Sequence, residues 1–365
     1  MQALRLTARY LVGLLFIISG LIKINDPVGT QIKLEEYFEV FANDISPVFL
    51  KLAPLALELS VILSVLEVVL GIALLLHFRP RLTTAVLLGI IVFFTFLTFY
   101  SAYFNKVTDC GCFGDALKLT PWQSFWKDIV LLVLILILFV SYYKGPAPYP
   151  KPGAGLWVLA TALISTGIAL YAIEHLPFID FRAYKVGVNI PTAMQPSEPY
   201  RYAYIMSKGG QQYELTEYPA EEEGYEYNDI KLLNPEAAPT ISDFAVWNNE
   251  GTITDAVLQG RQLLIIVHKT DKADGDNVPA INRLAQSLQG RVNSLVLTSS
   301  DESSYEAFRH QHQLALPYAF ADATLLKTIM RANPGLVLLQ EGTVLGKWHH
   351  NDTPEASDIL KLLRN

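Results

Sequence analysis

Charged residues are scarce in this sequence: they make up 17% of its 365 residues, whereas hydrophobic residues make up 51%. A soluble domain carries about 25% charged residues. An entirely soluble chain is therefore excluded, and we expect the lipid bilayer to be one partner. The net charge is −7 and no run of basic residues occurs. The chain therefore lacks the basic surface that nucleic-acid binding needs, and no nucleic acid is expected as a partner.

Cysteine is almost absent, because the chain has only Cys110 and Cys112, with Gly111 between them. A disulfide across one residue closes a very small ring, whose strain makes it easier to reduce. This favours a redox-active pair, with a static disulfide or a metal-binding or inert pair as alternatives. Histidines also occur late in the chain, but no C-x-x-C or H-x₃-H spacing is present, so no metal site is predicted.

Long hydrophobic runs are the main positive feature. A membrane-spanning helix needs about 20 apolar residues, and five stretches approach or meet that length: 7–24, 53–76, 82–104, 125–143 and 156–173. No small-x-small cleavage site follows the first stretch, so we interpret it as an uncleaved span rather than a signal peptide.

Lysine and arginine predict the orientation of these spans. If every span crosses, one side carries three basic segments, with Arg5 and Arg9, Arg79 and Arg81, and Lys144 and Lys151. By the positive-inside rule that side is cytoplasmic. The prediction is a bacterial inner (plasma) membrane protein with a cytoplasmic N-terminus. Both cysteines and everything after Glu174 then lie in the periplasm, where disulfides persist.

The composition changes after the last span and predicts a mixed fold. We expect a four-helix membrane domain at 1–145, then a cytoplasmic loop and a fifth, tethering helix at 146–175. A periplasmic connector at 176–238 carries a β-hairpin turned at Gly209-Gly210. A soluble α/β domain follows at 239–365.

The order of elements in this last domain points to a known fold. "RQLLIIVHK" and "VNSLVLTSS" are typical of buried strands, "VPAINRLAQSLQG" and "DESSYEAFRHQHQL" of helices, and "PGLVLLQEGTVLGKWHH" of a hairpin turned at Glu341-Gly342. The pattern resembles a thioredoxin-like fold of the membrane-tethered thiol-reductase type. That resemblance implies that Pro334 is the cis-proline facing the active site.

The same resemblance exposes a departure. Counting back from "VPAINRL", the C-x-x-C positions hold Asp271-Lys272-Ala273-Asp274, at the expected opening of the first helix. Carboxylates cannot perform thiol–disulfide exchange, because the attacking group must be a thiolate. We therefore expect this domain to bind a partner, through Pro334, Asp271 and Asp274, rather than to act as a thioredoxin.

The first 145 residues resemble the DoxX and MauE-like family of small four-helix membrane proteins. The resemblance is carried by "SGLIKINDPVG" at 19–29, by "CGCFGDALKLTPWQSFWKD" at 110–128, and by Glu67 within the second span. The MauE-like branch is associated with disulfide handling in the periplasm, which implies a redox role for the cysteine pair.

Ionisable residues in or beside the spans are further candidates, since such groups in a membrane are functional hypotheses by default. On a regular helix Glu58 and Glu67 face roughly opposite ways. Glu58 is expected at the periplasmic interface, toward Lys23. Glu67 is expected to carry protons or to sit in a buried pair. Asp128 suits a helix N-terminus, where the helix dipole favours a carboxylate.

Three functions follow from these features. The first is a membrane thiol–disulfide oxidoreductase component, in which Cys110 and Cys112 exchange electrons with a periplasmic thiol protein; a quinone in the bundle is conceivable, although no residue spacing indicates one. The second is a non-catalytic, membrane-anchored interaction protein that uses the degenerate domain. The third is a small-molecule or ion carrier built around Glu67. The sequence leaves open whether the protein is an enzyme.

Overall fold

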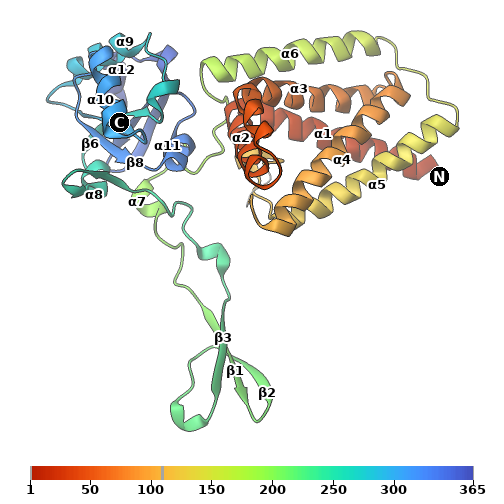
Figure 1. Ribbon diagram of the computed structural model, residues 1–365, viewed down its shortest axis with the longest axis horizontal. Helices are drawn as coiled ribbons and strands as arrows, with labels where there is room; N and C mark the ends of the chain where they lie inside the picture. The colour runs from red at the N-terminus through yellow and green to blue at the C-terminus, as the bar shows by residue number, and fades with distance from the viewer. Residues whose placement is uncertain (1, 108–110, 365) are drawn as a thin grey trace. The chain divides into compact units, whose positions relative to one another are not determined.

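The computed structural model describes residues 2–107 and 111–364, and the chain forms two compact units, Met1–Arg182 and Ala183–Asn365 (Figure 1). Cys110 of the candidate pair lies outside the described residues.

The first unit is a helical bundle. Its long helices are α1 (Gln2–Asn25), α3 (Ala56–Leu75), α4 (Pro80–Phe104), α5 (Pro121–Lys144) and α6 (Ala154–Glu174). Among the described residues, five helices are long and apolar enough to cross a membrane, α3 being extended by the preceding 3₁₀ segment η1 (Pro47–Leu55). The five predicted spans are therefore confirmed as helices, and the chain is a membrane protein.

Small residues let α1 and α3 pack closely. A Cβ atom added to Gly20 would lie 2.5 Å from Val68 and 2.9 Å from the Ser64 carbonyl oxygen, and one added to Gly71 would lie 2.7 Å from the Gly13 carbonyl oxygen. Glycine at such contacts is typical of helix packing in membranes. This close approach lets short polar side chains of α1 reach α3.

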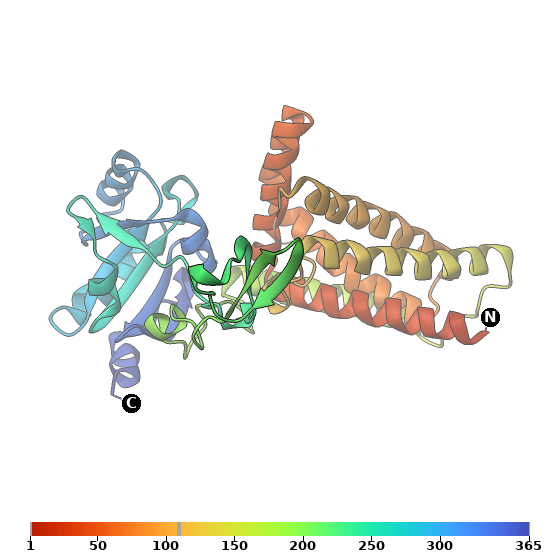
Figure 2. The ribbon, with the colours of Figure 1, turned by 90° about the horizontal axis from the view of Figure 1, so that it is seen from below.

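The connection after α1 contains an unpredicted helix, α2 (Pro27–Asp44). Asp26 caps it by accepting a hydrogen bond from the Gly29 N–H, and Pro27 occupies the first turn, both common at helix starts. Tyr37 and Phe41 are buried on its inner face. In Figure 2, α2 stands across the direction of the other helices.

The second unit begins with the short helix α7 (Ile190–Ala193) and a three-stranded antiparallel sheet of order β2-β1-β3. Strands β1 (Tyr202–Lys208) and β2 (Gln211–Leu215) flank Gly209-Gly210, which confirms the predicted hairpin. Strand β3 (Glu226–Leu232), which pairs with β1, was not predicted. It is almost wholly exposed and lacks the apolar alternation that marks a strand.

A mixed seven-stranded sheet of order β10-β9-β6-β7-β8-β4-β5 forms the rest of the unit. Its strands are β4 (Val246–Asn248), β5 (Gly251–Thr252), β6 (Arg261–Val267), β7 (Asn293–Thr298), β8 (Tyr318–Ala321), β9 (Gly335–Gln340) and β10 (Thr343–His349). Strands β6, β7 and β8 run parallel to one another, whereas β9 pairs antiparallel with β6, and β10 pairs antiparallel with β9. The helices are α8 (Thr254–Leu258), α9 (Val278–Leu288), α10 (Glu302–Gln311), α11 (Ala323–Ile329) and α12 (Ala356–Leu362).

The predicted order of strand, helix, strand, helix and hairpin is present as β6, α9, β7, α10 and β9–β10, which fits the thioredoxin-like assignment. Strand β8 and helix α11, which lie between α10 and the hairpin, were missed. Both are short, and short apolar runs do not distinguish strand from helix. Residues of β6 and α9 share one buried core that includes Leu263, Ile265 and Ile281.

Candidate functional site

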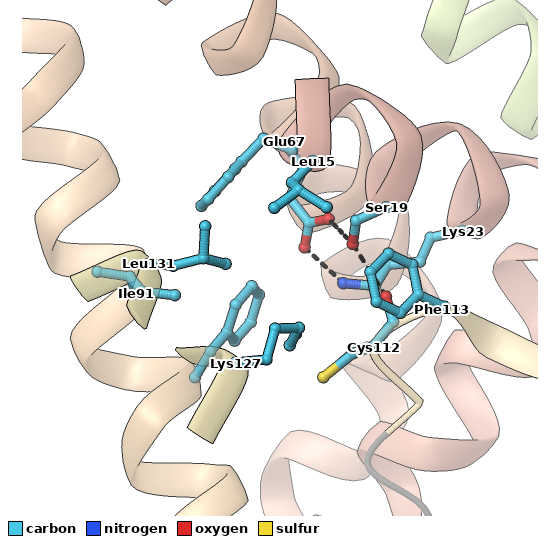
Figure 3. Close-up of a pocket in the computed structure, with 11 residues that line it drawn as sticks. Leu15, Ser19, Lys23, Glu67, Ile91, Cys112, Phe113, Lys127 and Leu131 are labelled. Carbon is cyan, nitrogen blue, oxygen red and sulfur yellow. Dashed lines mark hydrogen bonds and ion pairs between the residues drawn. The ribbon is translucent and has the colours of Figure 1, made fainter. Parts of the chain in front are cut away.

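A pocket opens within the helical bundle where α1, α3, α4, α5 and the loop before α5 meet (Figure 3). Its volume, measured as the space open to the centres of water-sized molecules, is about 30 Å³, so it is a small pocket with room for a few waters. Most of the lining is apolar, but four lining residues, Lys23, Glu67, Cys112 and Lys127, carry ionisable side chains. An apolar pocket with a few converging polar groups is the usual form of a small-molecule or active site.

The centre of the polar wall is an ion pair between α1 and α3. Lys23 Nζ donates to Glu67 Oε1 at 2.5 Å, and the two side chains are only 9% and 2% exposed. Glu67 is thus the member of a buried pair. Glu58, by contrast, is exposed, and Lys23 pairs with Glu67 instead of reaching toward Glu58 as expected. The reason is rotational, since Glu67 faces α1 across the close glycine contact.

Ser19 joins this pair to the cysteine loop. Its Oγ lies 2.7 Å from Glu67 Oε2 and 2.9 Å from the carbonyl oxygen of Cys112 (Figure 3). Cys112 is half-buried and lines the pocket. The sequence predicted both Glu67 and Cys112 as candidates, and the structure brings them together. Ser19 opens the segment at 19–29 that carries the family resemblance, but its bridging role was not predicted, because a serine in an apolar run does not indicate its partners.

The backbone at Gly111 requires glycine. Its φ is +65°, a left-handed conformation that side chains disfavour, and a Cβ atom there would lie 3.0 Å from Lys33 Cγ on α2. Helix α2 therefore contacts the loop that carries Cys112. The left-handed backbone conformation explains why the residue between the two cysteines is glycine.

A second buried carboxylate lies near the pocket. Asp128 Oδ1 is 2.9 Å from Lys127 Nζ, Asp128 Oδ2 accepts a hydrogen bond of 3.0 Å from the Thr98 hydroxyl, and the Asp128 side chain is 1% exposed. The ammonium of Lys127 also lies over the Phe113 ring, 5.2 Å from its centroid.

The expectation that Asp128 lies at the N-terminus of a helix is wrong. Helix α5 begins earlier, at Pro121, where Thr120 and Gln123 form a capping box. Asp128 therefore lies inside the helix, where an ion pair and a hydroxyl satisfy its charge.

In the α/β unit, the structure brings the Asp271–Asp274 turn beside Pro334. The Asp274 N–H donates to the Asn333 carbonyl oxygen at 2.8 Å, and the Asn333–Pro334 peptide bond is cis, as the resemblance implied. Asp271 and Asp274 are exposed, whereas Pro334 is buried. A partner would therefore meet the turn rather than the proline ring. Helix α9 begins only at Val278, so the turn precedes the helix instead of opening it.

A histidine lies close to this turn, at the end of β6. Burial lowers the pKa of His268 to about 4, although the Met330 carbonyl oxygen, 3.2 Å from Nε2, partly opposes the shift by favouring the protonated ring. Within residues 2–107 and 111–364, no group of three or more His, Cys, Asp or Glu residues is placed to hold a metal ion.

These features define a membrane protein whose helical bundle holds a buried ion pair beside a cysteine loop and is followed by an α/β domain. Residues 1–141, most of the bundle, match the family described as Methylamine utilisation protein MauE. Protein TlpB of Flavobacterium psychrophilum is 32% identical over 143 residues. That match covers 38% of this chain and 37% of the relative. The MauE-like resemblance of the bundle is thereby confirmed.

Proposed function

We propose that this protein is a thiol–disulfide redox component of the bacterial inner membrane, in which Cys110 and Cys112 exchange electrons with a thiol protein of the periplasm. The observation that carries this proposal is the placement of Cys112 on a pocket that Lys23 and Lys127 also line. Lys23 and Lys127 are paired with Glu67 and Asp128, but they are the positive charges of this pocket, and nearby ammonium groups favour the thiolate, which is the reactive form of cysteine. The MauE family match supports the same assignment, because the MauE-like branch is associated with disulfide handling.

The exchange is balanced without a further reactant. A thiolate of the pair attacks the partner's disulfide, forms a mixed disulfide and releases one partner thiolate. The second cysteine of the pair then attacks the mixed disulfide, which closes the Cys110–Cys112 bond and frees the second partner thiol. Two electrons pass to the partner, and the two protons of the pair end on the partner thiols. The reverse sequence reduces the pair.

This proposal includes the orientation derived from the basic residues, with the N-terminus in the cytoplasm and the α/β domain in the periplasm. The cysteine loop and the α/β domain then face the same compartment. Since Asp271–Asp274 replaces the thioredoxin cysteines, the α/β domain contributes binding rather than exchange.

The test counts thiols in cells that produce the full chain, using a maleimide mass tag before and after mild reductant. Because the chain has two cysteines, the tag reports on the pair alone, and a variant with both cysteines replaced by serine is the control. We expect the wild-type pair to shift between no tag and two tags. A single Cys112→Ser or Cys110→Ser variant should accumulate a reducible mixed disulfide. A pair that never changes state contradicts the proposal.

A second candidate function is partner binding by the α/β domain without exchange. It is favoured by one observation, the exposed Asp271–Asp274 turn held against the cis-proline segment. A photo-crosslinking residue at Asp271 or Asp274 of the full chain should give one discrete product, absent when the same residue replaces the exposed Asp255 of α8. Identical products from all three positions would rule out this surface.

A further inference from the structure

We propose that Glu67 is a positioning residue whose protonation is coupled, through Ser19, to the state of the Cys112 thiol. This inference rests on the proposed thiol function and adds to it the group that stores a proton during exchange. Nothing in the exchange chemistry itself requires a carboxylate at this position.

The first argument is the burial of the Lys23–Glu67 pair. Removing two charges from water is unfavourable, and apolar residues of similar size often serve stability equally well. A lipid-embedded bundle makes such a pair still less favourable, and ionisable residues there usually have a function. Neither side chain is more than 9% exposed, so solvent does not explain their presence.

The second argument is the single proton of the Ser19 hydroxyl. Two acceptors lie within its reach, Glu67 Oε2 at 2.7 Å and the Cys112 carbonyl oxygen at 2.9 Å. When Glu67 is ionised, the hydroxyl donates preferentially to the carboxylate, since charged acceptors bind more strongly. When Oε2 carries a proton, it donates to Ser19, and the Ser19 proton goes to the Cys112 carbonyl. The protonation of Glu67 thus decides how the cysteine loop is held.

The third argument is electrostatic. A Cys112 thiolate and a Glu67 carboxylate would be two negative charges on one pocket, and like charges disfavour each other's ionised form. The formation of the thiolate therefore accompanies proton gain at Glu67. When the disulfide forms, the sulfur charge is lost, and Glu67 gives its proton back as the partner thiolate is protonated. Such coupling is reciprocal by thermodynamic necessity.

Two further charged groups line the same pocket as Glu67 and Cys112. In the described part of the chain, the remaining titratable side chains on the pocket are Lys23 of α1 and Lys127 of α5. Helix α4 contributes the apolar side chains of Ile91 and Phe94, and α2 and α6 contribute no lining residue.

Infrared difference spectroscopy of the full chain in lipid nanodiscs tests the coupling directly. The carbonyl-stretch band of a protonated carboxylic acid should appear on reduction of the wild-type protein and disappear on oxidation. The band should be absent from Glu67→Gln, present in the exposed-site control Glu58→Gln, and restored in Glu67→Asp. Ser19→Ala should weaken it, because the hydrogen-bond link is lost while the shared pocket remains.

A second measurement is the rate of maleimide alkylation as a function of pH. Glu67→Gln removes the negative charge and leaves Lys23, so the thiolate should form at lower pH. We expect alkylation about ten-fold faster than wild type in mildly acidic buffer. A wild-type pair that cannot be reduced or oxidised would refute the proposed function. A wild-type pair that cycles normally, with no carboxylic-acid band and with a Glu67→Gln profile equal to wild type, would refute this coupling alone.

Discussion

Replacement of Lys23 by methionine should strongly destabilise the helical bundle. The change removes the ammonium 2.5 Å from Glu67 Oε1 and leaves a carboxylate that is 2% exposed. Among the described residues, the Ser19 hydroxyl is then its remaining side-chain donor. Removing one member of a buried pair costs about 3–5 kcal/mol. The double variant Lys23→Met, Glu67→Leu removes both charges and fills similar volume, so it should lie close to wild type or above it by about 1–4 kcal/mol.

Unfolding of the full chain in mixed micelles, followed by the helical circular dichroism signal, measures these differences. The matched control is Lys33→Met, which breaks the Lys33–Glu36 pair of 2.9 Å on α2, where the side chains are 29% and 37% exposed. Such a surface pair contributes about 0–1 kcal/mol. If Lys23→Met is no more destabilising than Lys33→Met, or if the two single changes of the buried pair simply add in the double variant, the pair is not coupled and the reasoning fails.

Three further predictions concern packing and titration. Gly20→Val should destabilise the bundle by about 1–3 kcal/mol, since its Cβ would meet Val68 at 2.5 Å, and the same unfolding assay measures it. The Tyr100 hydroxyl holds the pKa of Asp44 below its usual value. The stability that ionised Asp44 gives the fold is therefore lost only as the pH falls through that lowered pKa. Tyr100→Phe should raise the pKa of Asp44, which the carboxyl carbon chemical shift of labelled aspartate measures. Burial lowers the pKa of His268 to about 4 in the folded protein, whereas the unfolded chain gains this proton near pH 6.5. The free energy of unfolding, read from amide-exchange protection of β6, should therefore fall by about 1.4 kcal/mol for each pH unit between about pH 6.5 and 4. His268→Gln should abolish this pH dependence.

The sequence predicted much of the fold because its strongest patterns are local. The five spans follow from unbroken apolar runs, and the hairpin of β9 and β10 follows from two apolar strands around Glu341-Gly342. Helix α2 was missed although Asp26 and Pro27 mark its start, because its residues are too polar for a span.

The partnership of the site residues could not be predicted. Lys23 and Glu67 lie on different helices, and the close contact at Gly20 and Gly71 packs α1 against α3. The sequence placed Glu58 nearer to Lys23 because Lys23 lies at the end of the first span and Glu58 at the start of the second, whereas the rotation of α3 turns Glu67 inward. Asp128 was misjudged since the start of α5 is set by Thr120, well before the apolar run begins.

The central claim is that Cys110 and Cys112 form a working redox pair. Its most direct test equilibrates the full chain in nanodiscs with a graded series of reduced and oxidised glutathione and counts free thiols by maleimide mass tag. The account predicts that both thiols disappear together, over a range of glutathione ratios in which each state can be populated. A pair that remains entirely oxidised or entirely reduced across the whole series would contradict it.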